Sequence, residues 1–580
     1  MTPRLPDDLW CCVLRWLDVS AHVRWGACAR AYRRLVRSHP QAWLTVALEK
    51  TSFCPEQIAK RVSSVTTHFS APRIPDSVVV RTSDLLRTAK RLTLLRLGRQ
   101  SVFECQGLCY TPHLRVLDLS HTRVHDLSPL AACPALLDVR LQGTDVSDLT
   151  PLSQCRLLET LSVAECLAVT SLTPLAACVG MRCLDVAHTQ VCDLAPLAGM
   201  PRLESLNVHS CPVSHLEPLA RCARLRTLNL SFTPLLHLAH LSGASVAQLE
   251  SLKCSGCDVQ DLTPLAGCVR LQDLDLSFCR AVQDLKPLGR CVNLRQLSLR
   301  ETSVQTLRAL QGCRALQELD VGGCHALTDV GTVVGFPLLR TLDLHGCDAV
   351  EDLSPLAACS GLTRLYLNFT LTSHLHHVAA QKTLSRLDLT NCRALHDVQP
   401  LAGLQHLVSL KLNLTSVQDV SPLRHCSQLR SLSLFGCTQV RDVAVLRHCS
   451  YLSELDLGRT GVTDLAPFPD FGQLQRLLLM HTGISSLEAL ARCESLCMLD
   501  LRYCHSVLDL QPLCQCEHLR VLYLNCPGVS DLHVLADCVA LKRLRLGHYH
   551  PDNAGYRLTQ QRPDLFIAKP LFEACPTLRR

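Results

Sequence analysis

The sequence has few aromatic residues, little net charge and no long apolar run. Aromatic residues make up 4% of its 580 residues, and the formal net charge is +7, with acidic and basic residues interspersed. Such a mild charge provides no strongly basic surface, so we expect no nucleic-acid partner. No apolar run reaches the roughly 18 residues of a membrane-spanning helix, and the N-terminus shows no apolar signal-peptide core. We therefore expect no membrane span and a location in the cytoplasm or nucleus.

Motifs for catalysis are also missing. The chain has no glycine-rich phosphate loop, no nucleophile elbow and no HExxH histidine pair. Cys254-Ser-Gly-Cys257 has zinc-ligand spacing, but no second cysteine pair follows it. His374, His376 and His377 cluster, either as a solvated irregular segment or as a metal site, and we favour the first. We predict no enzymatic activity, no metal and no cofactor.

The chain does contain a repeat, whose first clear copy runs from Leu114 to Cys133 and opens with L-x-x-L-x-L. The opening leucine, or an apolar substitute, recurs about every 22.5 residues. Its 21 positions are 92, 114, 136, 158, 181, 203, 225, 249, 271, 294, 316, 339, 362, 384, 407, 429, 452, 474, 496, 519 and 541. A period in the twenties that contains this motif resembles the leucine-rich repeat.

Each repeat predicts a short strand and a tight return. The L-x-L alternation favours a strand whose leucines face the core. The return segment usually reads V-x-D-L-x-P-L, and its proline suits a short 3₁₀ turn better than a long helix. This form resembles the internalin-like class of repeat. The predicted fold is an α/β solenoid, a leucine-rich-repeat horseshoe or superhelix of about 21 repeats of 22–23 residues, with parallel concave strands and short 3₁₀ or irregular convex segments.

The 35 cysteines follow the repeat. Thirteen lie three residues before a repeat start, at 133, 155, 178, 222, 268, 291, 313, 359, 426, 449, 493, 516 and 538. Nine more lie three residues after the last strand leucine, at 166, 211, 257, 279, 324, 347, 392, 437 and 504. Two fixed registers indicate small buried side chains and not a disulfide framework, so we expect reduced thiols.

The residue that turns the chain off each strand is mostly threonine or cysteine. All seven 23-residue repeats carry cysteine there, and the copies with threonine have 22 residues, apart from the 24-residue repeat that starts at 225. We predict two turn geometries, in which a hydroxyl or a thiol satisfies buried backbone groups.

Residues 1–48 do not follow the repeat and predict three short amphipathic helices. Their order, from Leu-Pro-x-acid-Leu to a closing tryptophan, resembles the F-box. The chain departs from that pattern at Tyr32, where tryptophan is usual, at Ala29, where cysteine is common, and by one extra residue before Trp43. The resemblance implies docking on a Skp-family adaptor through Leu5, Pro6, Leu9, Val13, Leu14, Leu17, Tyr32 and Trp43. The alternative is a helical cap on the first repeat.

The rest of the chain then divides into a linker and N-terminal cap at 49–91, the solenoid at 92–546, and a C-terminal cap or tail at 547–580. Aspartates recur between the two leucines of L-x-L, and aromatic residues accompany them on the same predicted face. Solubility of an exposed strand face is one interpretation, and a partner surface with aromatic anchors is the other. The candidate partner-binding residues are Phe232, Phe278, Asp320, Asp343, Tyr366, Phe369, Asp388, Lys411, Leu414, Phe435 and Tyr503.

The combined pattern resembles F-box/leucine-rich-repeat proteins. This resemblance implies a substrate-recognition subunit of an SCF-type cullin-RING ubiquitin ligase, with a protein substrate on the concave face and no reactive group from this chain. The alternative is a non-catalytic leucine-rich-repeat scaffold that regulates another enzyme, such as a cyclase or a phosphatase.

Overall fold

The computed structural model describes residues 68–70, 86, 90–99, 102–241, 247–465, 472–529, 532–547, 558 and 560–568. The chain divides into two compact units, Met1–Leu294 and Arg295–Arg580. The F-box-like segment 1–48, most of the predicted cap at 49–91 and much of the predicted tail lie outside the described residues.

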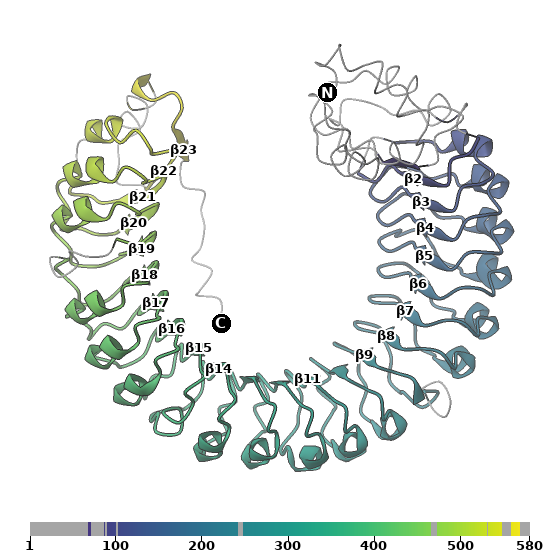
Figure 1. The fold of residues 1–580 in the computed structure, drawn as a ribbon, viewed down its shortest axis with the longest axis horizontal. Helices are drawn as coiled ribbons and strands as arrows, with labels where there is room; N and C mark the ends of the chain where they lie inside the picture. Colours follow the sequence, from purple (N-terminus) through teal and green to yellow (C-terminus); the bar gives the residue numbers. More distant parts are fainter. Residues whose placement is uncertain are drawn as a thin grey trace, which may run out of the picture. The chain divides into compact units, whose positions relative to one another are not determined.

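The first unit is a ladder of short parallel strands joined by 3₁₀ turns (Figure 1). Its strands are β1 His68–Ser70, β2 Leu94–Arg96, β3 Val116–Asp118, β4 Asp138–Arg140, β5 Thr160–Ser162, β6 Cys183–Asp185, β7 Ser205–Asn207, β8 Thr227–Asn229, β9 Ser251–Lys253 and β10 Asp273–Asp275. Its 3₁₀ helices are η2 Gln106–Tyr110, η3 Ser128–Ala132, η4 Thr150–Gln154, η5 Thr173–Ala177, η6 Ala195–Gly199, η7 Glu217–Arg221, η8 Thr263–Gly267 and η9 Lys286–Arg290.

The second unit repeats the same plan. Its strands are β11 Gln296–Ser298, β12 Glu318–Asp320, β13 Thr341–Asp343, β14 Arg364–Tyr366, β15 Arg386–Asp388, β16 Ser409–Lys411, β17 Ser431–Ser433, β18 Glu454–Asp456, β19 Arg476–Leu478, β20 Met498–Arg502, β21 Val521–Asn525, β22 Arg543–Leu546 and β23 Phe566–Ala568. Its 3₁₀ helices are η10 Arg308–Gly312, η11 Gly331–Gly335, η12 Ser354–Ala358, η13 Gln399–Gly403, η14 Ser421–His425, η15 Ala444–His448, η16 Glu488–Arg492, η17 Gln511–Gln515 and η18 His533–Ala536.

Parallel strands and short 3₁₀ turns were both expected from the sequence, and both are confirmed. The strands pair in parallel with no slip, so that Leu342 of β13 lies opposite Leu365 of β14. Among the described residues, two strands lie beyond the predicted solenoid range: β1 pairs with β2, and β23 pairs with β22. In the return segment that carries the three clustered histidines, residues 376–380 form turns in place of a 3₁₀ helix.

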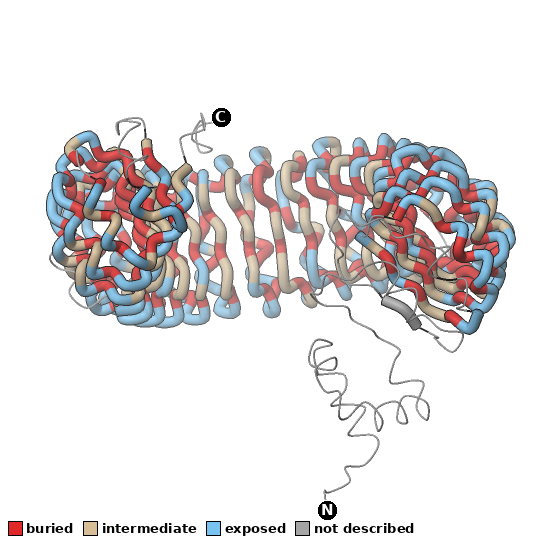
Figure 2. Tube along the Cα trace, turned by 90° about the horizontal axis from the view of Figure 1, so that it is seen from above, coloured by how far each residue is buried: buried red, intermediate tan, exposed pale blue. Residues whose placement is uncertain are grey.

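The core of each unit is made of the same few positions, used again in every repeat. In the repeat that starts at 114 they are Leu114, Leu117, Leu119, Val124, Leu127, Leu130 and Cys133, all at most 1% exposed. Figure 2 shows buried and exposed residues alternating along the tube. Burial of one leucine side chain contributes about 2 kcal/mol, so each unit is stabilised chiefly by contacts between neighbouring repeats.

The predicted roles of threonine and cysteine at the turn are confirmed. The Thr370 hydroxyl donates to the Leu367 carbonyl of its own repeat at 2.6 Å. The Cys392 thiol, one repeat later, donates to the same carbonyl at 3.1 Å. Threonine therefore satisfies the carbonyl of the last L-x-L leucine in its own repeat, whereas cysteine satisfies the equivalent carbonyl of the preceding repeat. Every cysteine that the structure describes is a free thiol, and most are buried.

A second regular feature of the turn is a left-handed residue, two positions after the last strand leucine. In the described part of the chain, five of these residues are glycines: Gly143, Gly256, Gly323, Gly346 and Gly436. Fourteen others are not, namely Arg99, His121, Glu165, His188, Ser210, Phe232, Phe278, Glu301, Phe369, Asn391, Leu414, Arg459, His481 and Tyr503. L-residues adopt this conformation at a cost of about 1–2 kcal/mol each. We call these positions the left-handed row.

Candidate protein-binding face

The residues on either side of each middle strand leucine point away from the core. In the second unit, the strand register places Asp320, Asp343, Tyr366, Asp388 and Lys411 opposite one another on β12 to β16. We call these five residues the central row. The predicted binding residues from these five strands therefore form one continuous line on the strand face.

The aspartates of the central row have a structural role that the sequence analysis missed. Oδ1 of Asp320 accepts a hydrogen bond from the N–H of Gly322 at 2.9 Å, and Asp388 does the same for Thr390 at 3.0 Å. The equivalent bond recurs at Asp118, Asp185, Asp275, Asp343, Asp456 and Asp500. Each of these aspartates holds the backbone two residues later, and all but Asp500 are the last residue of their strand, so solubility alone does not explain their recurrence.

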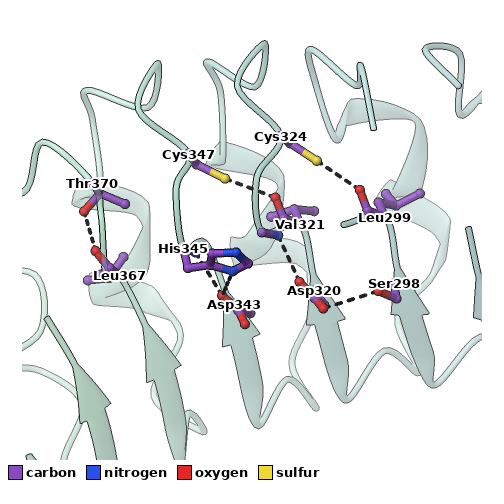
Figure 3. Close-up of polar contacts among 11 residues, drawn as sticks. Ser298, Leu299, Asp320, Val321, Cys324, Asp343, His345, Cys347, Leu367 and Thr370 are labelled. Atoms are coloured by element: carbon purple, nitrogen blue, oxygen red, sulfur yellow. Dashed lines mark hydrogen bonds and ion pairs between the residues drawn. The ribbon is translucent and has the colours of Figure 1, made fainter. Parts of the chain in front are cut away.

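Asp320, Asp343 and His345 lie at the start of the central row (Figure 3). Their ligand-type atoms all lie within 4.8 Å of one another, which makes them the one such group of three in the described chain. Hydrogen bonds already account for the arrangement, because His345 Nδ1 lies 3.0 Å from Asp343 Oδ1 and Ser298 donates to Asp320 at 3.3 Å. Burial, with Asp343 nearby, raises the pKa of the Asp320 carboxyl. We assign no metal to this group.

Charged side chains pair along the same face. Lys411 Nζ lies 3.2 Å from Asp388 Oδ2, and Arg364 Nη2 lies 2.9 Å from Glu318 Oε1. Arg364, Lys411 and Glu318 are partly exposed, so these pairs contribute little to stability and remain open to a partner. The sequence analysis missed Arg364 because, within the strand itself, it considered only the residue between the two leucines of L-x-L. The residue before the first of them faces the same side, as period-2 alternation requires.

Apolar side chains of the left-handed row line one edge of the strand face. Phe369 is 53% exposed and Leu414 is 44% exposed. The Leu414 side chain lies over Gly436, where any Cβ would collide with it. Phe435 is half-buried, and the Arg459 guanidinium carbon lies 5.8 Å from its ring centre. Large exposed apolar groups in a costly backbone conformation therefore border the central row.

The remaining predicted residues are placed elsewhere. Tyr503 follows β20 and stacks on His481, with ring centres 4.3 Å apart. Phe232 and Phe278 belong to the first unit, where Phe232 packs edge-on against His209 at 5.4 Å. The sequence analysis missed both histidine partners, although each stands at or beside the left-handed row. The predicted set is thus not one site, and the part that comes together is the central row with Phe369 and Leu414.

The regular strand register and 3₁₀ turns decide the fold. It is a leucine-rich-repeat solenoid. Solved structures of low sequence identity resemble this solenoid. The TLR13–ssRNA13 complex matches at 16% identity, with a TM-score of 0.51, over 90% of this chain and 94% of that one. A Leptospira interrogans LRR protein matches at 14% identity, with a TM-score of 0.43, over 84% of this chain and 98% of that one.

An internalin, InlF from Listeria monocytogenes, matches the solenoid at 20% identity, with a TM-score of 0.35, over 61% of this chain and 83% of that one. No protein-family model matches the chain, and no curated protein matches it. In the described part of the chain, no helix is both long and apolar enough to cross a membrane.

Proposed function

We propose that the chain is a non-catalytic protein-binding subunit, and that the central row with Phe369 and Leu414 holds a segment of a partner protein. The observation that carries this proposal is the exposure of Phe369 and Leu414 in left-handed turns, where glycine would cost less. Exposed apolar groups beside ion pairs and a tyrosine have the composition of an interface core with its polar rim.

We propose further that residues 1–48 dock on a Skp-family adaptor, which makes the chain the substrate receptor of an SCF-type cullin-RING ligase. This part rests on the F-box-like order of residues alone. The solenoid then holds the substrate near the ubiquitin-loaded enzyme, and catalysis comes from positioning. The second candidate is a scaffold that regulates another enzyme, in which residues 1–48 only cap the solenoid.

Adaptor binding separates the two candidates. Purified full-length chain is tested against the purified Skp-family adaptor, alongside the double variant Leu5→Ala/Pro6→Ala and a chain that lacks residues 1–48. We expect the full chain to bind and both changes to abolish binding. If the intact, folded chain does not bind the adaptor, the ligase proposal fails and the scaffold candidate remains.

The binding face is tested separately with Tyr366→Ala/Phe369→Ala. This variant should bind the adaptor as the full chain does but lose at least tenfold in affinity for the partner protein. Leu167→Ala is the matched control, because Leu167 is an exposed apolar residue of the first unit, 69% exposed, outside the proposed face. Equal loss in both variants would contradict the assignment of the central row.

A further inference from the structure

Two cysteines of adjacent repeats in the second unit lie sulfur to sulfur. Cys538 Sγ lies 3.5 Å from Cys514 Sγ. Cys514 is the fourth residue of η17, and Cys538 follows η18 two residues after its end. The contact therefore joins the return segments of two neighbouring repeats, on the side away from the strands.

The other cysteines in the register of Cys538 are engaged differently. The Cys516 thiol donates to the Leu490 carbonyl at 3.3 Å, and the Cys449 thiol donates to the Leu423 carbonyl at 3.5 Å. Both sulfurs are sealed between repeats, and burial raises the pKa of Cys516 to about 12. Protonated, enclosed thiols of this kind are poor targets for oxidants.

Cys514 differs because solvent reaches it. It is only partly buried, and it stands where η3 has the exposed residue Ala131. Its thiol also donates to the Val534 carbonyl of η18 at 3.3 Å, which holds the side chain against the next repeat. Cys538 lies beneath it and is buried. The pair thus combines one accessible sulfur with a second, protected sulfur in contact with it.

We propose that Cys514 and Cys538 are an oxidisable pair, which a peroxide converts into a disulfide between adjacent repeats. The Cys514 sulfur attacks the O–O bond of hydrogen peroxide, which leaves a sulfenic acid on Cys514 and releases one water. The Cys538 sulfur then displaces the hydroxyl of that sulfenic acid, forms the S–S bond and releases a second water. The two thiols lose two electrons and two hydrogens, and the peroxide takes up both.

Closing the bond requires the two sulfurs to move closer together. A disulfide has a sulfur separation of about 2.05 Å, so the two sulfurs must approach by roughly 1.5 Å. The bond closes a loop within the chain and joins the repeats that start at 496 and 519, whose strands are β20 and β21. Such a link restricts local opening near the C-terminal end of the solenoid. This chemistry is independent of the proposed partner-binding face on β12 to β16.

The test uses the full chain, reduced, freed of reductant and treated with hydrogen peroxide. Free thiols are then alkylated, and a non-reducing digest is analysed by mass spectrometry. We expect a peptide that links Cys514 to Cys538, two hydrogens lighter than the separate peptides and separable again by a thiol reductant. Amide hydrogen exchange in β20 and β21 should slow severalfold after oxidation. Cys192, an exposed cysteine of the first unit, is the internal control and should be alkylated or over-oxidised.

Two variants complete the test. Cys514→Ser should remove both the linked peptide and the slower exchange. Cys538→Ser should let peroxide carry Cys514 on to the sulfinic acid, because no second thiol intercepts the sulfenic acid. The proposal is overturned if Cys514 of the unmodified sequence stays fully alkylatable after peroxide, or if it reaches the sulfinic acid with no linked peptide formed.

Discussion

At the scale of single residues, the most informative position is the left-handed row. The sequence analysis selected Phe232, Phe278, Phe369, Leu414 and Tyr503 because apolar or aromatic side chains stood on a predicted face. It did not predict that all five adopt positive φ. A signal for this was present, since the same register holds glycine in five other repeats. A bulky residue at this position strains the backbone, and glycine would not. The presence of a bulky residue therefore favours a role for its side chain.

Phe369 provides a direct test of that strain. Because Phe369→Ala keeps a Cβ at a positive φ and Phe369→Gly does not, the glycine variant should be the more stable by about 1 kcal/mol. Urea unfolding of the two variants measures the difference. Leu371 is the matched control, because it is 63% exposed and has no positive φ. At position 371 the alanine variant should be more stable than the glycine variant. If the glycine variant were the more stable at both positions, the strain argument would be contradicted.

The turn carbonyls provide a second test at this scale. The Leu412 carbonyl accepts the Thr415 hydroxyl at 2.7 Å and the Cys437 thiol at 2.9 Å. Thr415→Val and Cys437→Ala should each lower stability by about 1 kcal/mol, since one donor remains in each case. The double variant leaves the carbonyl without a side-chain donor, so its loss should exceed the sum by about 1 kcal/mol. Additive urea midpoints would show that the two donors act independently.

At the scale of elements, the strands and turns could be predicted because each repeat carries the same sequence motif for them. L-x-L gave the strands, and the proline of V-x-D-L-x-P-L gave the 3₁₀ turns. The sequence analysis missed the hydrogen bonds that a side chain accepts from the backbone two residues later. One example is the bond from the N–H of Ser128 to Asp126 Oδ1, at 2.8 Å. Aspartate in this register looks like a solubilising residue until the turn geometry is known. Residues 376–380 of the return segment with the clustered histidines form turns instead of a 3₁₀ helix, and the motif did not predict this difference.

That return segment should respond to pH. Burial, with the neighbouring His376, lowers the pKa of His377 to about 4, and its Nε2 has no hydrogen-bond partner. Between about pH 4 and 6.5 the unfolded chain binds more protons at this residue than the folded chain, so stability falls as pH falls through that window. Urea midpoints at pH 7 and pH 5 measure the effect.

His377→Leu should reduce that difference between the two pH values. His396→Gln is the control, since it removes an exposed histidine nearby and leaves the buried His377 in place. An unchanged pH dependence in His377→Leu would assign the effect to other groups.

At the scale of the whole molecule, periodicity predicted the solenoid but not its ends or its partner. An internal repeat packs between two repeats of similar sequence, so its surroundings can be predicted from the motif. The end repeats and any ligand lack such a neighbour of known sequence. The strands β1 and β23 therefore extend the ladders beyond the predicted range. The binding face was only partly predictable for the same reason. Strand register places the residues of the central row together. The repeat period does not predict which of the exposed residues contact a partner.

A solenoid held by contacts between neighbours should tolerate the loss of one whole repeat. Removal of residues 407–428 deletes β16 and η14 and brings β17 next to β15 in the same register. The Cys437 thiol then meets the Leu389 carbonyl, as the Cys347 thiol now meets the Val321 carbonyl at 3.1 Å. We expect the amides of β15 and β17 to keep their protection from hydrogen exchange. Removal of 407–417 breaks the register and should expose both strands, and equal protection in the two deletions would contradict the nearest-neighbour account.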